Sequence, residues 1–325
     1  MSLLEIKNLK LEFGTGENAT RVVDGVSFSI AQGETVCVVG ESGCGKSVTA
    51  LSIAKLIPTP PANYVAGEIL LSGNDVLKMS KHQLRSIRGG VVSYIFQEPS
   101  ASLNPVFRVG RQIKESLQLH RPDAATDAEV IRLLKLVGIP APESRIHNYP
   151  FEMSGGMQQR VMIAMALASQ PKLLIADEPT TALDVTIQAQ ILDLLKDLKQ
   201  RFGMSILLIT HNLGIVGDIA DKVVVMYAGQ IVEMAPAREL LKRPLHPYTR
   251  ALMNSVPQLT GGPKRLQAIR GNVPPPGGYP TGCRFFPRCP TAHPECENSL
   301  PELKEVEPGR WVRTLYPADL LGGVQ

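Results

Sequence analysis

Residues 34–47 read Glu-Thr-Val-Cys-Val-Val-Gly-Glu-Ser-Gly-Cys-Gly-Lys-Ser, and this stretch decides the fold. Its first half, Glu34–Gly40, is a short β-branched apolar run that ends in glycine, which is typical of a buried parallel strand. Beyond it, Ser47–Ile57 carries apolar residues at helical spacing and ends before Pro58. The segment therefore predicts a strand, a glycine-rich loop and a helix in that order.

The loop between this strand and this helix matches the pattern G-x-x-x-x-G-K-[ST]. Its glycines allow successive backbone N–H groups to turn inward around an anion, and the helix that follows adds a positive dipole. Lys46 has the length to reach the β- and γ-phosphates of a nucleotide, while the Ser47 hydroxyl suits Mg²⁺. A chance glycine turn is disfavoured by the position between strand and helix. The predicted phosphate-binding residues are Gly40, Glu41, Ser42, Gly43, Cys44, Gly45, Lys46 and Ser47.

A second motif supplies acidic residues. The apolar segment Lys172–Ala176 predicts a strand, and Asp177 and Glu178 follow it directly. Open α/β sheets bind ligands at the carboxyl ends of their strands. We expect Asp177 to hold Mg²⁺, mainly through water, and Glu178 to orient and polarise an attacking water. An isolated acid pair after a strand is usually a solvated loop, but the phosphate loop upstream favours the functional interpretation.

The hydrophobic pattern divides the chain into regions. Residues 3–35 alternate as antiparallel strands, residues about 98–168 have the spacing of helices, and strand–helix alternation resumes at residue 172. Lys222–Tyr227 and Gln230–Met234 predict a closing hairpin. The fold class is therefore a P-loop α/β unit over residues 1–243: a mostly parallel sheet core, an antiparallel β subdomain and a helical subdomain at about 98–168.

Composition excludes several other classes of protein. The 325 residues are 44% hydrophobic and 20% charged, as in ordinary globular proteins. A net charge of +4 is too weak for a dedicated nucleic-acid binder. The longest uninterrupted apolar stretch, Val161–Ala168, is far below the roughly 18 residues of a membrane span. The N-terminus lacks a basic leader followed by an apolar segment, so we expect no secretory signal.

The C-terminal residues 244–325 form a different region. Ten of the 26 prolines lie between Pro257 and Pro301, which excludes long helices and central strands there and predicts a loop-rich extension. Three of the five cysteines are in the same region, at Cys283, Cys289 and Cys296. An odd number of cysteines favours reduced thiols and a cytosolic setting. Of the other two, Cys37 is expected in the core and Cys44 as a tolerated small residue.

The stretch Met153–Arg160, Met-Ser-Gly-Gly-Met-Gln-Gln-Arg, narrows the choice among nucleotide hydrolases. It resembles the signature sequence of ATP-binding cassette (ABC) proteins and stands shortly before the Asp177 strand, as in that family. The other family elements occur in order: Phe13, Gln97 after Tyr94-Ile95-Phe96, Ala182-Leu183-Asp184, and Thr210-His211. The resemblance covers about residues 3–235. One departure is Met157, which replaces the usual glutamine after the two glycines.

This resemblance implies roles for the matching residues. Two cassettes pair head to tail, so that each ATP lies between the Lys46 loop of one subunit and the Ser154 helix of the other. The implied ATP contacts, besides the phosphate loop, are Phe13 on adenine together with Ser154, Gly155, Gly156 and Asp184. Gln97 senses Mg²⁺ and the γ-phosphate, and His211 contacts the γ-phosphate. The implied catalytic residues are Glu178, His211 and Gln97, and the Mg²⁺ site comprises Ser47, Gln97 and Asp177.

Two C-terminal segments indicate one branch of the family. Pro244–Thr249 and Gly282–Pro290 resemble segments of the ATPases of dipeptide, oligopeptide and nickel importers. The resemblance implies an ATP-hydrolysing motor, a translocase subunit, at the cytoplasmic face of the inner membrane. Its implied partners are a second cassette subunit, two membrane permeases and, indirectly, an extracytoplasmic substrate-binding protein, with no nucleic acid. The transported substrate, and whether the second cassette is the same chain or a related one, stay open.

The three C-terminal cysteines pose a separate question. In the resembling branch such cysteines, with a fourth downstream, hold a [4Fe–4S] cluster, but this sequence has no cysteine after Cys296. The alternatives are a three-cysteine cluster, a fourth ligand such as His293, zinc, or no metal.

A different function class is a soluble, non-transport ABC ATPase that acts on nucleic acid or ribosomes. Such proteins usually carry tandem cassettes, long coiled coils or zinc insertions within the cassette, and none of these is present here. A P-loop kinase is disfavoured because the Ser154 segment would have no role in it.

Overall fold

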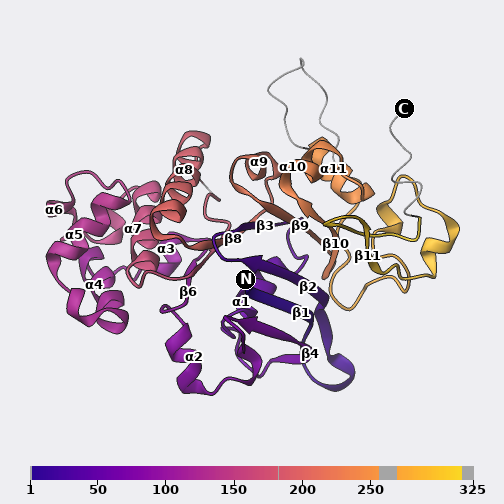
Figure 1. Cartoon of the computed structure of the whole chain (residues 1–325), viewed down its shortest axis with the longest axis horizontal. Helices are drawn as coiled ribbons and strands as arrows, with labels where there is room; N and C mark the ends of the chain where they lie inside the picture. The colour runs from indigo at the N-terminus through magenta and orange to yellow at the C-terminus, as the bar shows by residue number, and fades with distance from the viewer. Residues whose placement is uncertain (1, 182, 256–268, 317–325) are drawn as a thin grey trace, which may run out of the picture. The chain divides into compact units, whose positions relative to one another are not determined.

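The computed structural model describes residues 2–181, 183–255 and 269–316, and it confirms the α/β cassette fold (Figure 1). The chain forms two compact units. The first comprises Ser2–Ile30, Glu34–Lys78 and Ile209–Gln325, and we call it the phosphate-loop unit. The second comprises Ala31–Gly33 and Met79–Leu208, and we call it the helical unit.

The phosphate-loop unit contains an antiparallel sheet with the strand order β2, β1, β4, β5. The bounds of these strands are Thr20–Ala31, Ser2–Phe13, Ala62–Leu71 and Asn74–Asp75. In the β1–β4 pair, Leu4 is opposite Leu71 and Phe13 is opposite Ala62. Leu9 and Leu11 are fully buried, so the alternation in the sequence marks the core face, as predicted.

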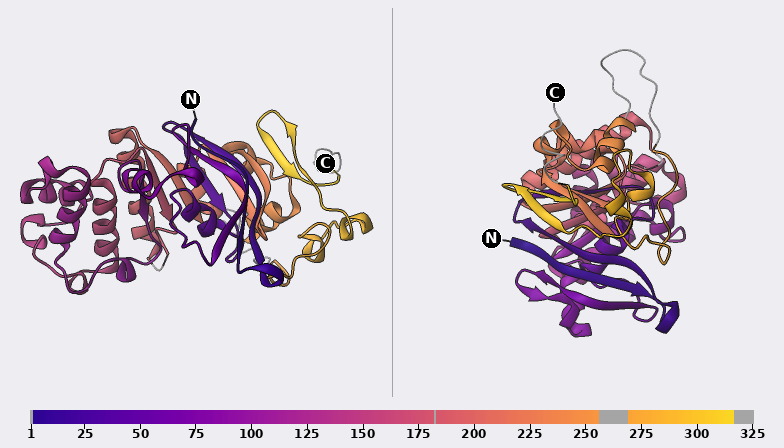
Figure 2. Two further views of the ribbon diagram at one scale, coloured as in Figure 1. Left: turned by 90° about the horizontal axis from the view of Figure 1, so that it is seen from below. Right: turned by 90° about the vertical axis from the view of Figure 1, so that its right-hand side faces the viewer.

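The same unit holds five further strands in the order β11, β12, β10, β9, β3. Their bounds are Leu303–Glu307, Arg310–Arg313, Gln230–Pro236, Lys222–Tyr227 and Thr35–Val39. β3 is completely buried and parallel to β9, whereas β9 and β10 form the predicted antiparallel hairpin. Figure 2 shows the β11–β12 hairpin in yellow; it pairs with β10 and was not predicted from the sequence.

The helices of this unit are short. They are α1 (Lys46–Ser52), α9 (Val216–Ile219), α10 (Ala237–Lys242) and α11 (Pro247–Ser255). α1 ends at Ser52, five residues before the predicted end at Ile57. The reason is local: Ile53–Lys55 form a turn in which Lys55 has a left-handed φ of 51°.

The helical unit contains β6 (Val92–Ile95) parallel to β7 (Leu173–Asp177), with β8 (Ser205–Thr210) next to β7. Its helices are α2 (Lys81–Ile87), α3 (Pro99–Ser102), α4 (Val109–His120), α5 (Asp127–Leu136), α6 (Pro142–Arg145), α7 (Gly155–Leu167) and α8 (Val185–Phe202). Figure 1 shows α4, α5 and α7 packed side by side. α7 is apolar around most of its circumference and largely buried, so it forms the centre of this group.

The division at residue 243 stays a prediction about domain organisation. By contacts, the residues after 243 belong to the same compact unit as the phosphate loop. Among the described residues, none of the helices has both the length and the apolar character that a membrane span requires.

Candidate active site

The phosphate loop connects β3 to α1. At two of its positions, a residue with a side chain would clash with neighbouring backbone. Gly40 has a φ of 151°, and a Cβ there would lie 2.2 Å from the Met226 carbonyl oxygen. Gly45 has a φ of 98°, and a Cβ there would lie 2.9 Å from the Val22 carbonyl oxygen. The packing of neighbouring strands thus explains two of the three glycines in the motif.

Lys46 is held inside this loop. Its side chain is buried, and Nζ donates hydrogen bonds to the carbonyl oxygens of Gly40, at 2.8 Å, and Glu41, at 3.0 Å. These carbonyls fix the position of the ammonium group. Ser47 follows, with a partly exposed side chain. The loop therefore supplies the cation and the hydroxyl that the motif requires.

The two N-terminal cysteines are structural. Cys37 lies in the core of β3 and Cys44 is buried in the phosphate loop. Burial raises the pKa of both thiols, so both stay protonated near neutral pH. The burial of Cys37 confirms its predicted place in the core.

A cavity of about 650 Å³ opens beside the phosphate loop. One part of its wall comes from Gly40, Glu41, Ser42 and His211. The other part comes from the C-terminal region, through Leu252, Ser255, Ile269, Asn272 and Val273. His211 thus lines the same cavity as the phosphate loop, and the C-terminal region adds a wall that the sequence did not predict.

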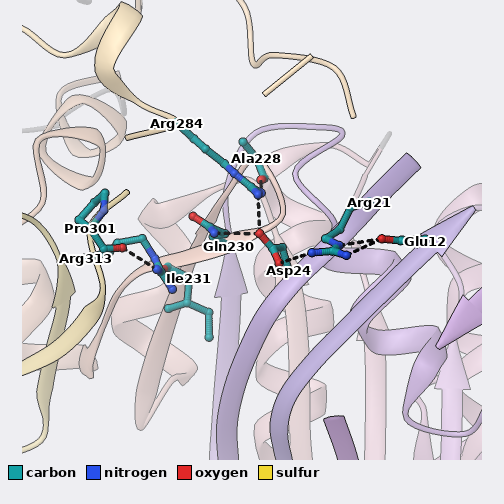
Figure 3. Close-up of polar contacts among 9 residues, drawn as sticks. All are labelled: Glu12, Arg21, Asp24, Ala228, Gln230, Ile231, Arg284, Pro301 and Arg313. Atoms are coloured by element: carbon teal, nitrogen blue, oxygen red, sulfur yellow. Dashed lines mark hydrogen bonds and ion pairs between the residues drawn. The ribbon is translucent and has the colours of Figure 1, made fainter. Parts of the chain in front are cut away.

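Phe13, the residue expected to stack on adenine, is the last residue of β1 and is partly exposed. Its neighbour Glu12 accepts hydrogen bonds from Arg21 on β2 at 2.6 and 2.9 Å. Arg21 also pairs with Asp24 at 3.5 Å. This chain of charges stabilises the end of the antiparallel sheet that carries the aromatic ring (Figure 3).

In the helical unit, Gln97 and Glu178 meet. The Gln97 amide donates to the Glu178 carboxylate at 3.3 Å, and the Thr181 hydroxyl donates to the same oxygen at 2.9 Å. Glu178 has a φ of 48°, an uncommon value for a residue with a side chain, and such strain concentrates at functional sites. Asp177 precedes it at the end of β7. Thr181 was not predicted from the sequence, because its contact with Glu178 depends on the local turn.

The signature residues form an exposed helix start. Ser154 is the N-cap of α7, and its hydroxyl accepts a hydrogen bond from the Met157 N–H at 3.4 Å. The Gln158 amide donates to the carbonyls of Pro150 and Met153 and so fixes the segment before the helix. The side-chain polar contacts of this segment thus come from Gln158, whereas Met157 contributes its backbone N–H. Ser154 and Gly155 stay exposed to solvent.

Asp184 begins the next helix. Its carboxylate accepts from the Ile187 N–H at 2.9 Å and caps α8. Asp184 therefore has a structural role as a helix cap, in addition to the ATP contact that the family resemblance implies. Ala182 of the same motif lies outside the described residues.

The three C-terminal cysteines line one cavity of about 120 Å³, together with His246 and His293. Burial is the main cause of the raised pKa of Cys283, and the other two thiols raise it further. The His293 ring stacks on Tyr316, with centroids 4.1 Å apart. Within the described residues, no group of three or more His, Cys, Asp or Glu side chains is arranged to hold a metal ion. The three cysteines thus share one cavity.

Comparison with known proteins agrees with this geometry. Residues 23–181 match the ABC transporter family, and residues 232–296 match the C-terminal region of oligopeptide/dipeptide transporters. A probable peptide ABC transporter ATP-binding protein of Sinorhizobium fredii is 52% identical over 94% of this chain and 92% of its own length. The oligopeptide transport ATP-binding protein AppD of Bacillus subtilis is 50% identical over 96% of both chains. The chain belongs to the peptide branch of ABC transporter ATP-binding proteins.

This ABC subunit also matches solved cassettes. A dimeric post-hydrolysis structure of the cassette MJ0796 bound to ADP and Pi has a TM-score of 0.64 and 26% identity, over 72% of this chain and 99% of that one. The dipeptide transport ATP-binding protein DppD of Escherichia coli is 46% identical over 99% of both chains. As a member of this family, the subunit is an ATPase that acts with a second cassette and membrane components.

Proposed function

We propose that this subunit hydrolyses ATP at the cytoplasmic face of the inner membrane to drive an importer for dipeptides, oligopeptides or related small substrates. The observation that supports this most strongly is continuous similarity to peptide-transport ATP-binding proteins over 94–99% of the chain, including the C-terminal region. The non-transport alternative lacks such support, because these relatives are named for transport.

The proposed roles follow from the chemistry of each side chain. Lys46 and the N–H groups of residues 40–47 hold the triphosphate. Hydroxyl, amide and carboxylate oxygens suit Mg²⁺, so Ser47, Gln97 and Asp177 would hold this ion, which neutralises phosphate charge when it is bound. Glu178 orients the water that attacks the γ-phosphate. The bonds from Gln97 and Thr181 keep its carboxylate in one orientation.

The proposed active assembly is a head-to-tail pair of cassettes. The exposed Ser154 end of α7 then contacts the nucleotide held by the second cassette, and Asp184 contributes at the same interface. His211 contacts the γ-phosphate, and Phe13 stacks on adenine.

Two permease subunits are the proposed membrane partners, with a substrate-binding protein outside the membrane. The helical unit exposes large apolar side chains that suit this contact: Phe96 is 44%, Val106 70% and Phe151 71% exposed. Phe151 stacks on Tyr149, with centroids 5.5 Å apart. In the sequence, Phe96 is next to Gln97, and Phe151 shortly precedes the signature segment. A permease that binds these side chains would therefore contact segments adjoining both motifs.

Glu178→Gln tests the catalytic assignment. The amide retains the shape of the carboxylate but cannot polarise water, so ATP hydrolysis should fall by about 10²–10⁴-fold while ATP binding persists. ATP should then hold the two cassettes together, detected by size-exclusion chromatography and by crosslinks between cysteines introduced near Lys46 and Ser154.

Thr186→Ala, an exposed change on α8, serves as the control and should retain turnover. Turnover of Glu178→Gln at the wild-type rate would overturn the role of Glu178. Absence of ATP-dependent crosslinks, with each candidate second cassette supplied, would overturn the head-to-tail assembly.

A metal at Cys283, Cys289 and Cys296 is a separate question. Anaerobic purification followed by iron, sulfide and zinc assays distinguishes a cluster, zinc and no metal.

A further inference from the structure

We infer that the C-terminal region positions the phosphate loop for ATP through Arg288 and Tyr248, which hold Glu41 from two directions. Glu41 is the second residue of the loop and carries a carboxylate next to the place proposed for a triphosphate. This inference rests on the proposed assignment of the loop as the ATP site. It assigns Arg288 as a positioning residue.

The main contact is a bidentate ion pair. Arg288 Nη1 and Nη2 donate to the two carboxylate oxygens of Glu41, at 2.8 and 3.0 Å. The Arg288 side chain is 4% exposed, whereas that of Glu41 is 30% exposed. Paired, partly desolvated groups of this geometry are stronger and more directional than surface ion pairs.

Arg288 is itself fixed by the C-terminal region. Nε donates to the Arg270 carbonyl at 2.8 Å, and Nη2 also donates to the Gly271 carbonyl at 3.2 Å. The remaining donor contacts the Tyr227 hydroxyl at 3.4 Å. Because these partners occupy the guanidinium on several sides, its position relative to Glu41 is set by the protein and not by solvent.

Tyr248 holds the backbone of the same residue. Its phenol oxygen accepts a hydrogen bond from the Glu41 N–H at 2.9 Å. The ring is fully buried and packs on Tyr227, at 4.7 Å between centroids, and on Phe285, at 5.4 Å. The hydroxyl therefore has one fixed position.

These contacts reach the ammonium group that binds phosphate. The Glu41 carbonyl accepts from Lys46 Nζ at 3.0 Å, so all three polar groups of Glu41 have defined partners. Loss of Arg288 would release the Glu41 side chain and leave the Tyr248 bond as the contact from the C-terminal region, so the carbonyl that holds Lys46 would be less well fixed. It would also leave an uncompensated negative charge beside the incoming triphosphate. Both effects weaken ATP binding more than the chemical step.

A second arginine of the same segment holds the other sheet of this unit. Arg284 donates to the Ala228 carbonyl and to the Asp24 carboxylate, which also accepts from Gln230 at 3.1 Å (Figure 3). Asp24 pairs with Arg21, which pairs with Glu12 beside Phe13. The Cys283–Cys289 segment thus contacts both the phosphate loop and the strands that lead to the proposed adenine side.

The test compares Arg288→Gln with Arg243→Gln in the full-length chain. Both changes remove an arginine–glutamate pair, but the Arg243–Glu307 pair is remote from the loop in sequence, and in the described part of the chain no hydrogen bond or ion pair joins it to the loop. We expect Arg288→Gln to raise the KM for ATP about tenfold while kcat changes less than about threefold, and Arg288→Lys to restore part of the affinity. Arg243→Gln should leave both unchanged. A KM for Arg288→Gln at the wild-type value, or an equal rise in both variants, would overturn the inference.

A double-mutant cycle with Glu41→Gln separates positioning from general instability. If Arg288 acts through the Glu41 charge, Glu41→Gln should reduce the effect of Arg288→Gln on KM by at least half. Equal effects of Arg288→Gln in both backgrounds would overturn the inference, and thermal melting checks that each variant is folded.

Lys46→Ala separates this inference from the proposed function. Isothermal titration with MgATP should show loss of binding for Lys46→Ala. Undiminished MgATP binding by Lys46→Ala would overturn the assignment of the loop as the ATP site. If Lys46→Ala loses binding but Arg288→Gln has the wild-type KM, the positioning role of Arg288 alone is overturned.

Discussion

His246, from the segment Pro244–Thr249, has a structural role in the fold. Its side chain is 3% exposed, and Nδ1 accepts a hydrogen bond from the Tyr248 N–H at 3.1 Å. This bond requires a neutral ring with an unprotonated Nδ1. Burial, and then the charges of Arg313 and Arg250, lower the pKa of His246 to about 3. The residue thus helps to fix the tyrosine that holds Glu41.

This pKa predicts a pH dependence of stability. An unfolded histidine titrates near 6.5, so below that pH the unfolded chain binds a proton that folded His246 does not, and stability falls. The expected loss from this group between pH 7 and pH 5 is about 2 kcal/mol in the free energy of unfolding. In His246→Asn, which retains an acceptor but does not titrate, urea unfolding at the two pH values should lack this loss.

Desolvation raises the pKa of the buried Glu233 carboxylate, so this group changes the pH dependence of stability in the opposite direction. Glu233 is present in both the wild type and His246→Asn. The difference between wild type and variant therefore isolates His246. An identical pH dependence in His246→Asn would contradict the assignment.

At the scale of elements, β10 anchors the start of α11. The Glu233 carboxylate on β10 accepts hydrogen bonds from the N–H groups of Leu245 and His246, each at 2.8 Å. Its side chain is 1% exposed and lies 4.0 Å from Arg310 on β12. One buried acid thus connects two strands to the helix that carries Tyr248.

Glu233→Ala should destabilise the protein strongly. It leaves two buried N–H groups and Arg310 without this acceptor, so we expect a loss of about 3–5 kcal/mol in the free energy of unfolding. Glu239→Ala, at an exposed position of α10, is the matched control and should change stability by less than about 0.5 kcal/mol. Chemical denaturation measures both, and equal stability of the two variants would show that the anchor is unimportant.

Helices and buried strands of the cassette could be predicted because local patterns determine them. β3 and the β9–β10 hairpin lie where their apolar runs indicated. α5 lies within the region of helical spacing and begins at Asp127, because Thr126 caps it through the Glu129 N–H. β11 and β12 were missed because each is short and depends on pairing with β10.

Residues of the site were predictable where a motif contains them. The phosphate loop and the Gln97–Glu178 contact follow from residues that the sequence singled out. The Arg288–Glu41 pair does not, because its partners are 247 residues apart and no local pattern joins them. Its only signal in the sequence is an arginine between two cysteines.

At the scale of the whole molecule, the C-terminal region completes the unit that carries the phosphate loop. β12 covers the edge of β10, Tyr248 and Phe285 pack on Tyr227, and Arg288 holds Glu41. The sequence predicted a loop-rich extension here, and the contacts make this extension part of the phosphate-loop unit.

Truncation after Arg243 should therefore impair the cassette itself. The shortened chain exposes Tyr227 and the edge of β10 and loses both anchors of Glu41. We expect a melting temperature lower by about 10 °C or more, consistent with a loss of several kcal/mol, and weaker MgATP binding. Calorimetry and titration measure these quantities. A truncated chain with the melting temperature and ATP affinity of the full-length protein would show that the appendage is independent.

The long separation between Glu41 and Arg288 has a consequence for biosynthesis. The ribosome takes about 12–50 s to extend the chain by the 247 positions from Glu41 to Arg288 at typical bacterial rates. Throughout that interval a growing polypeptide on the ribosome contains the phosphate loop but lacks Arg288, which positions Glu41 in that loop. Full affinity for ATP therefore arises only near the end of synthesis, so unfinished chains bind the nucleotide weakly.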